Sequence, residues 1–309
     1  MKILITGALG NLGSSLLSTL ANLKGVEIVA IDDHVGKKIK IMEKYVEKDN
    51  IYFQNIGSTA ITENFLDNLH TDLVIHLAYK NNVDLKKETN LNFSHTNHQL
   101  TRYIADYCSK FQIPLLYPSS TSLYHNLNGE VYEETIISKT LTDYSSSKLL
   151  DEQYIKSLSS LKYSILRLGS VHGYSNGMKF NTVVNKFCWQ YANEIPLTVW
   201  SGSLNVVRPY LSIADFVSAV EFLVSSMNFS GEIYNLVTRS VTTSEIIETI
   251  ELIGGSKARV EFEERVDFLP TSIYVSTAKI VSKGYKFRGS LAEDIKNTLK
   301  KLESKQLNL

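Results

Sequence analysis

A tyrosine and a lysine four residues apart are the clearest candidates for catalysis in this sequence. The segment Tyr144-Ser145-Ser146-Ser147-Lys148 opens a stretch with a helical pattern. Residues four apart lie on one face of a helix, so the Lys148 ammonium is expected beside the Tyr144 phenol. A nearby positive charge favours the phenolate and lowers the pKa of a tyrosine from its usual value of about 10. Tyr144 is therefore predicted to act as a general base near neutral pH, taking a proton from a hydroxyl group as hydride leaves the same carbon.

Hydroxyl groups also gather immediately after a predicted strand. Four hydroxyl-bearing residues, 119–122, follow the apolar run over residues 114–117. A serine hydroxyl at the end of such a strand can donate a hydrogen bond to a substrate oxygen and accept one from it. Serine-rich strand ends are also ordinary turns, so this cluster indicates catalysis only together with the tyrosine–lysine pair.

Three glycines near the N-terminus indicate a nucleotide-binding turn. Gly7, Gly10 and Gly13 have the spacing GxxGxxG between a β-branched run and a helical pattern. Glycine lets the backbone approach a pyrophosphate, and the free amides of the helix N-terminus attract that anion. Asp32 and Asp33 end the next strand, where a carboxylate accepts hydrogen bonds from the adenosine ribose and repels a 2'-phosphate. With no adjacent arginine, the pattern predicts NAD rather than NADP; a glycine turn without a nucleotide is the alternative.

The elements that must position these residues alternate between strands and helices. Strands are predicted over residues 2–6, 26–31, 51–53, 72–77, 114–117 and 163–168, and helices over 11–22, 61–69, 90–110 and 144–158. Such alternation implies a parallel sheet with helices on both faces, and ligands bind beyond the carboxyl ends of its strands. We therefore predict an α/β fold with a doubly wound parallel (Rossmann) sheet and a smaller mixed C-terminal lobe.

The pattern changes after about Gly169. A strand–helix–strand unit from Arg208 to Leu236 is predicted to return to the sheet, and further helices are predicted over residues 243–252 and 291–302. The expected organisation is an NAD-binding domain over residues 1–170, with the returning segment near 205–237, and a substrate-binding lobe over 171–204 and 238–309.

Taken together, these motifs resemble those of the extended short-chain dehydrogenase/reductase family, in particular its NAD-dependent nucleotide-sugar epimerases and dehydratases. The likeness covers nearly the whole chain and includes TGALGNLG (6–13), HLAYK (76–80), SSTSLY (119–124), YSSSK (144–148), LRLGSVHG (166–173), VVRPYLSIADFVSAV (206–220) and GEIYNL (231–236). The resemblance implies that Tyr144 is the catalytic acid/base, that Lys148 positions the nicotinamide ribose and lowers the pKa of the tyrosine, and that Ser120 is their hydroxyl partner. Many such relatives act in bacterial surface-polysaccharide synthesis, which is the setting it implies.

The resemblance also assigns residues to NAD and to a nucleotide-diphosphate sugar. Asn97 matches an asparagine on the long helix below the site, and Asn55 takes the place of an aspartate that reads the adenine. The set implied for NAD is Gly7, Gly10, Asn11, Leu12, Gly13, Asp32, Asp33, Asn55, Ile56, Leu77, Ala78, Asn97, Tyr144 and Lys148. The set implied for the substrate is Ser122, Ser170, His172 and Arg208, of which Arg208 matches an arginine that grips the diphosphate.

Departures from the family pattern narrow the expected reaction. Thr121, Ser122 and Leu123 fill the stretch in which 4,6-dehydratases carry an acidic pair and related decarboxylases a glutamate. Ser170 replaces a frequent asparagine, and His172 a frequent tyrosine. We therefore expect redox chemistry at one carbon, namely epimerisation through a transient keto-sugar. Reduction of a keto-sugar nucleotide is the alternative. A non-catalytic NAD-binding protein is a third hypothesis, against which the retained tyrosine, lysine and serine weigh.

The composition argues against several other classes of protein. The 309 residues carry 32 Lys plus Arg and 32 Asp plus Glu, so the formal net charge is zero and a nucleic-acid partner is not expected. No apolar run reaches the roughly 20 residues of a membrane span, and the N-terminus lacks a signal-peptide pattern, so no membrane partner and a cytoplasmic location are expected. Neither the two cysteines nor the seven histidines form a metal-ligand pattern, so no metal is expected.

The predicted helix at 144–158 is apolar on more than one side. Its apolar residues are Leu149, Leu150, Tyr154, Ile155 and Leu158. One part must face the sheet and the rest can face a second subunit. By resemblance, family members join this helix and the preceding one into a four-helix bundle, which implies a homodimer. Packing within one chain is the alternative.

Overall fold

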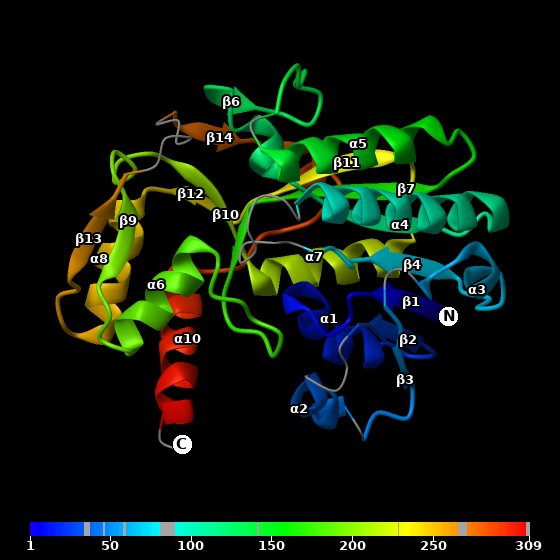
Figure 1. Cartoon of the computed structure of the whole chain (residues 1–309), viewed down its shortest axis with the longest axis horizontal. Helices are drawn as coiled ribbons and strands as arrows, with labels where there is room; N and C mark the ends of the chain where they lie inside the picture. Colours follow the sequence, from blue (N-terminus) through cyan, green and yellow to red (C-terminus); the bar gives the residue numbers. More distant parts are fainter. Residues whose placement is uncertain are drawn as a thin grey trace.

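A parallel sheet of seven strands runs through the larger part of the molecule (Figure 1). The computed structural model describes residues 1–33, 38–45, 47–57, 60–80, 90–140, 142–227, 229–264 and 271–306. The sheet contains β1 (Lys2–Thr6), β2 (Glu27–Asp32), β3 (Ile51–Asn55), β4 (Leu73–His76), β5 (Leu115–Ser120), β7 (Tyr163–Leu168) and β11 (Glu232–Leu236). Their order is β11-β7-β5-β4-β1-β2-β3, and each neighbouring pair is parallel.

Helices cover both faces of this sheet. Because side chains alternate along a strand, Ile3 and Ile5 of β1 join one apolar core and Leu4 joins the other. The first core is covered by α1 (Asn11–Ala21) and α7 (Ile213–Ser226), and the second by α4 (Asn90–Phe111) and α5 (Asp143–Ser157) (Figure 1). The predicted α/β fold with a doubly wound parallel sheet is therefore confirmed.

The order of the strands reverses between β1 and β4. The chain places β2 and β3 on one side of β1, then crosses to place β4, β5 and β7 on the other side. At such a reversal the loops after two neighbouring strands diverge and leave a crevice at the carboxyl edge. Thr6 and His76, the last residues of β1 and β4, are register partners there, so the loops that begin at Gly7 and Leu77 frame the crevice.

A second, smaller core lies outside the large sheet. It is formed by α6 (Val183–Ala192), α8 (Thr243–Gly254) and α10 (Leu291–Gln306), which pack their buried apolar faces together. Beside them β9 (Leu197–Trp200) pairs with β13 (Val260–Glu263) in parallel (Figure 1). The short remaining elements are α2 (Ile39–Met42), η2 (Glu43–Tyr45), α3 (Glu63–Asp67), η5 (Thr121–Tyr124), β6 (Gly129–Val131), β14 (Ile273–Val275) and α9 (Ala278–Ser282).

One predicted return to the large sheet is wrong in part. β11 joins the sheet beside β7, but the preceding strand β10 (Arg208–Ser212) does not. β10 lies in a separate sheet, parallel to β8 (Ser170–His172) and antiparallel to β12 (Arg239–Val241). The main chain of β10 passes close to Gly169, where a Cβ would lie 3.1 Å from the Pro209 carbonyl oxygen. The main chain of β10 therefore crosses directly over the end of β7.

The element that carries the hydroxyl cluster is longer than predicted. β5 runs to Ser120, whereas the apolar pattern ends at Tyr117. Ser120 is therefore the last residue of the strand and stands at the carboxyl edge of the sheet, beside Leu168 of β7. Within the described ranges, no helix is both long and apolar enough to cross a membrane.

Candidate active site

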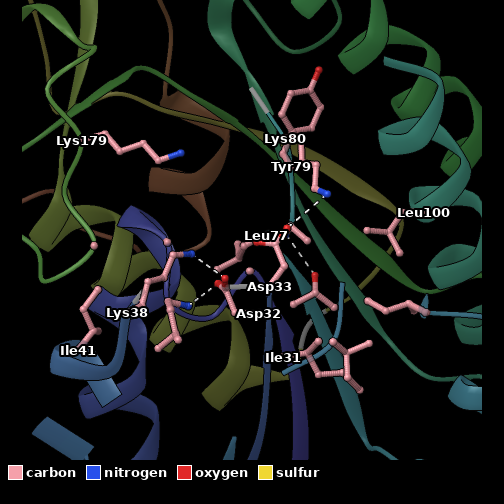
Figure 2. Close-up of a pocket in the computed structure, with 18 of the residues that line it drawn as sticks. Ile31, Asp32, Asp33, Lys38, Ile41, Leu77, Tyr79, Lys80, Leu100 and Lys179 are labelled. Atoms are coloured by element: carbon pink, nitrogen blue, oxygen red, sulfur yellow. Dashed lines mark hydrogen bonds and ion pairs between the residues drawn. The ribbon is translucent and has the colours of Figure 1, made fainter. Parts of the chain in front are cut away.

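A cavity of about 730 Å³ opens at the carboxyl edge of the sheet, at the reversal between β1 and β4. Its walls come from the glycine turn, the ends of β2 and β4, α4 and the loop after β8 (Figure 2). The lining includes Gly7, Gly10, Asp32, Asp33, Ile56, Leu77, Ala78 and Asn97, all of them predicted to hold NAD.

The glycine turn is shaped by two close approaches of the backbone. Gly7 has φ +69°, and a Cβ there would lie 2.7 Å from the Ala78 amide nitrogen. A Cβ at Gly13 would lie 2.4 Å from the Gly7 carbonyl oxygen, so only glycine lets α1 pack so close to the turn. Gly10 is the N-cap of α1, and no side chain caps the helix there. Backbone amides at this helix end and its partial positive charge are therefore available to an anion.

Two carboxylates and two lysines form the floor of the cavity. The buried carboxylate of Asp32 accepts a hydrogen bond of 2.8 Å from the Leu9 amide and one of 2.6 Å from the Lys38 ammonium. Asp33 pairs with Lys80 at 3.3 Å, and both pairs are visible in Figure 2. The sequence pattern missed both lysines. Lys38 partly neutralises the carboxylate that is predicted to repel a 2'-phosphate, so charge alone does not exclude that group.

The predicted tyrosine and serine come together at the end of β5. Thr142 caps α5 by accepting a hydrogen bond of 3.1 Å from the Ser145 amide, which places Tyr144 in the first turn of the helix. Ser120, at the end of β5, lies close enough to Tyr144 for its hydroxyl to lower the pKa of the phenol. Ser120 is held in turn, because its hydroxyl oxygen accepts a hydrogen bond of 3.1 Å from the Ser122 amide.

The predicted lowering of the tyrosine pKa is not found. The pKa of Tyr144 is raised to about 12, chiefly by burial; the Ser120 hydroxyl lowers this pKa and neighbouring Tyr79 raises it. The Lys148 ammonium donates instead to the Tyr117 hydroxyl at 3.0 Å and to the Pro118 carbonyl at 2.9 Å. The lysine thus sits on the same helix face as predicted, but its charge is directed toward β5.

The ring of Tyr79 lies between the cavity and this pair. The Lys148 nitrogen is 4.4 Å from the Tyr79 ring centroid, and the Tyr79 and Tyr144 rings meet edge to face at 5.4 Å. Tyr79 lines the cavity, whereas Tyr144, Lys148 and Ser120 do not. Figure 2 shows its ring directed away from Asp32 and Asp33. In this structure Tyr79 therefore separates the cofactor cleft from the tyrosine–lysine pair.

Other residues predicted to hold NAD lie close to the cavity without lining it. They are Asn11 and Leu12 in the first turn of α1, Gly13, and Asn55 at the end of β3. Asn97, which does line the cavity, has a clear structural task. Its side chain accepts from the Lys80 amide and donates to the Lys80 carbonyl, both at 2.9 Å, and so fixes the segment after β4.

A loop that the sequence pattern missed closes over the glycine turn. Its residues Asn176, Gly177, Met178 and Lys179 line the cavity. The Gly177 amide donates to the Ser14 hydroxyl at 2.8 Å, and a Cβ at Gly177 would lie only 2.4 Å from the Gly10 carbonyl oxygen. The glycine at 177 is the signal that marks this contact in the sequence.

The four residues predicted for the substrate do not line the cavity. Ser122 follows Ser120 in η5, and Ser170 lies half-buried on β8. The His172 side chain is 1% exposed and contacts the Asp294 carboxylate at 2.9 Å, which ties β8 to α10. Arg208 on β10 donates to the main-chain carbonyls of Thr271 and Val207.

The buried set of the site fits a dinucleotide better than a metal ion. The uncapped helix end suits a pyrophosphate, and Asp32 at the end of β2 suits the hydroxyls of a ribose, so the residues present fit NAD. Within the described part of the chain, no group of three His, Cys, Asp or Glu side chains is placed to hold a metal ion.

Comparisons with known proteins agree with a site that fits NAD. The family model described as "NAD dependent epimerase/dehydratase family" matches residues 3–236. An uncharacterized UDP-glucose epimerase of Bacillus subtilis is 26% identical over 293 residues, which is 90% of each chain. The crystal structure of UDP-glucuronic acid 4-epimerase from Bacillus cereus with NAD matches with a TM-score of 0.86 and 22% identity over 100% of both chains. That of dTDP-glucose 4,6-dehydratase from Bacillus anthracis with NAD matches with 0.84 and 19% identity over 99% of this chain and 98% of the other.

Proposed function

The chain belongs to the NAD-dependent epimerase/dehydratase family, and on that basis we propose that it epimerises a nucleotide-diphosphate sugar through a transient keto-sugar. Because the family is NAD dependent, NAD is the cofactor. The observation that carries the proposal is that Tyr144 and Ser120 come together at the end of β5, beside the cleft with the glycine turn. This pair can hold one sugar hydroxyl and exchange a proton with it.

The proposed chemistry divides between cofactor and side chains. When bound, NAD supplies a hydride acceptor and donor for one sugar carbon. Tyr144 takes the proton from the hydroxyl on that carbon and later returns it, and Ser120 holds the same oxygen. With a pKa of about 12, the Tyr144 hydroxyl keeps its proton near neutral pH. In that state it cannot accept a proton from a sugar hydroxyl. We infer that the Lys148 ammonium acts on Tyr144 from its place beside Tyr117, which requires the Tyr79 ring that covers it to move aside.

The turn after the catalytic serine supports epimerisation over dehydration. Removal of water from a sugar needs an acid beside the neighbouring carbon. The turn η5 carries Thr121, Ser122, Leu123 and Tyr124, and none of these side chains is a carboxylic acid. Reduction of a keto-sugar nucleotide is the second candidate, because it needs the same tyrosine, lysine and serine and no acid at this turn.

We infer that the sugar is carried on a uridine diphosphate. This is supported by the names of the two reported relatives that are epimerases, one of UDP-glucose and one of UDP-glucuronic acid, whereas the dTDP-glucose relative is a dehydratase. Ser122, Ser170 and Arg208 are the residues proposed to contact it, and Arg208 is half-buried at the start of β10. His172 is assigned a structural role because its side chain is already committed to Asp294.

Incubation with NAD and a panel of UDP- and dTDP-sugars tests the reaction. An epimerase forms a second sugar nucleotide, seen by chromatography, without accumulating reduced cofactor. Stoichiometric consumption of reduced cofactor with a keto-sugar would instead assign a reductase. Protein that binds no nicotinamide dinucleotide at all would exclude both.

Tyr144→Phe provides the matching variant. Loss of the hydroxyl removes the proton acceptor, so turnover is expected to fall by at least about a hundredfold while NAD still binds. The control is Tyr52→Phe, which changes an exposed tyrosine near the start of β3 and should have the turnover of the native protein. Native turnover in Tyr144→Phe would contradict the role assigned to this residue.

We also propose that two chains pair through α4 and α5, which lie side by side on one face of the sheet (Figure 1). The support is Leu150 of α5, an apolar side chain that remains 52% exposed in the single chain. Leu150→Glu places a charge there and is expected to shift a dimer to monomer in light scattering. Leu252→Glu, at an exposed leucine of α8 outside this helix pair, is the control and should leave the dimer intact. A native monomer would refute the pairing.

A further inference from the structure

A buried carboxylate stands behind Lys148 that the proposed reaction does not use. Asp151 lies three residues after Lys148 on α5, so both project from neighbouring positions of one helix face. Its side chain is fully buried. The Tyr117 hydroxyl donates to one of its oxygens at 2.5 Å, and the imidazole of His98 on α4 contacts the other at 2.6 Å.

A single hydroxyl connects this carboxylate to the lysine. The Tyr117 oxygen that donates to Asp151 also accepts a hydrogen bond of 3.0 Å from the Lys148 ammonium. A second acceptor, the Pro118 carbonyl at 2.9 Å, holds the ammonium from the same strand. Lysine, tyrosine and aspartate thus form one chain of hydrogen bonds, 5%, 1% and 0% exposed respectively. Such a chain is costly to bury unless its charges balance.

The other charges near Lys148 do not provide that balance. Glu152, the next acid on α5, is bound by the Arg167 guanidinium through bonds of 3.0 and 2.7 Å. Facing Lys148 from β4, His76 is fully buried between Thr6 and Thr101. Burial lowers the pKa of His76 to about 3, with the Lys148 charge also lowering it, so His76 is neutral at neutral pH.

The tyrosines around the ammonium are neutral as well. Burial raises the pKa of Tyr79, Tyr117 and Tyr144, which surround it from the loop after β4, from β5 and from α5. The pKa of Lys148 itself is lowered to about 8 by burial, and Asp151 is the first of two carboxylates that raise it. With Glu152 already paired, Asp151 is the charge left to hold the lysine protonated.

We propose that Asp151 is a positioning residue for Lys148, which through the Tyr117 hydroxyl keeps the buried ammonium protonated and fixes its place beside the cleft. The consequence for catalysis rests on the role of Lys148 in the proposed function. His98, on α4, contacts the second carboxylate oxygen of Asp151 and is partly exposed. The chain of hydrogen bonds therefore ends near the protein surface.

Titration of Lys148 by NMR tests the proposal directly. The protein is labelled with ¹³C-lysine, the Lys148 side-chain signal is assigned by its loss in Lys148→Arg, and its shift is followed from about pH 6 to about pH 10. In Asp151→Asn the shape is kept and the charge removed. An opposite charge nearby raises a lysine pKa by about one unit or more, so its removal should lower the Lys148 pKa by that amount. The ratio of neutral amine to ammonium is then expected to be about tenfold higher at a given pH.

Two further variants make the result specific. Asp106→Asn removes another carboxylate on the same helix pair, one that accepts a hydrogen bond of 2.6 Å from Tyr154, and should leave the Lys148 titration unchanged. Tyr117→Phe keeps the ring that faces the ammonium at 4.5 Å but removes the connecting hydroxyl, so the midpoint should again move to lower pH. If Asp151→Asn does not fold, Tyr117→Phe decides.

An unchanged midpoint in the folded variants would overturn the proposal. A second measurement follows the upper pH limit of NAD binding by calorimetry, which should move to lower pH in Asp151→Asn and stay unchanged in Asp106→Asn. The NMR titration needs neither NAD nor a sugar, so its outcome stands whether or not the protein proves to be an epimerase.

Discussion

The side chain of Tyr79 stands where the cofactor cleft meets the tyrosine–lysine pair. It covers the Lys148 ammonium with its ring and touches Tyr144 with its edge. A cation over an aromatic face gains about 1 kcal/mol in a partly desolvated setting. The resting arrangement therefore favours the lysine under the ring, and a ligand that needs the ammonium must compete with Tyr79 for it.

Removal of the ring should make NAD binding easier. Tyr79→Ala abolishes the contact with Lys148, so NAD is expected to bind about fivefold more tightly and to associate faster. Tyr79→Phe keeps the ring and should behave like the native protein. Calorimetry and stopped-flow fluorescence measure the two quantities. Equal or weaker binding in Tyr79→Ala would mean that the ring helps to hold the cofactor.

Helix α5 carries the site at the scale of secondary structure. Tyr144, Lys148, Asp151 and Ile155 follow one another at spacings of four, three and four, so they share the face that packs toward the sheet. Leu150 lies elsewhere on the helix and is exposed. The position of the first turn depends on the capping box between Thr142 and Ser145, because Tyr144 lies between them.

Loss of this cap should affect both stability and activity. Thr142→Ala removes the acceptor of the Ser145 amide, which is expected to lower the free energy of unfolding by about 1 kcal/mol and to reduce turnover because the first turn frays. Thr62→Ala removes the cap of α3, far from the hydroxyl cluster, and should lower stability while turnover is kept. Urea unfolding and turnover measure both effects. Native turnover in Thr142→Ala would show that packing alone positions Tyr144.

The molecule as a whole brings together two cores and a loop that spans them. The large sheet holds the glycine turn and the tyrosine helix, and the smaller core holds α6, α8 and α10. Between them, the loop after β8 reaches back to the glycine turn, where Ser175 donates to Asn11 at 2.7 Å. The cavity wall thus depends on contacts between residues more than 160 positions apart.

Acid should weaken the whole fold through His76. Its pKa is lowered to about 3 in the folded chain and is about 6.5 when unfolded, so the unfolded chain takes up the proton first as the pH falls. The contribution of His76 to the free energy of unfolding is present in full above about pH 6.5. It decreases by about 1.4 kcal/mol per pH unit as the pH falls toward about 3.

The variant His76→Gln removes the group that takes up this proton. The free energy of unfolding should therefore decrease less steeply with falling pH across that window. His70→Gln, at an exposed position after α3, should keep the native slope. Urea unfolding at a series of pH values measures the slopes. Parallel curves for native protein and His76→Gln would assign the acid sensitivity to other groups, among them His125, whose pKa burial lowers to about 4.

Local patterns in the sequence were enough to predict much of this molecule. The alternation of apolar runs and helical periods predicts the parallel sheet, because each pattern depends on which side chains face a core. The spacing of Gly7, Gly10 and Gly13 predicts the turn, and at Gly7 and Gly13 the neighbouring backbone leaves no room for a Cβ. The Tyr144–Lys148 spacing predicts a shared helix face, and that follows from helix geometry alone.

Tertiary structure decided what those side chains touch. Whether Lys148 faces Tyr144 or Tyr117 depends on a strand about 30 residues earlier, and no local spacing reports that the Tyr117 hydroxyl joins Lys148 to Asp151. The same holds for β10, because its pairing with β8 in a separate sheet depends on a distant segment of the chain. Periodicity depends on near neighbours in the chain, whereas hydrogen-bond partners, buried charges and pKa values depend on which distant segments pack together.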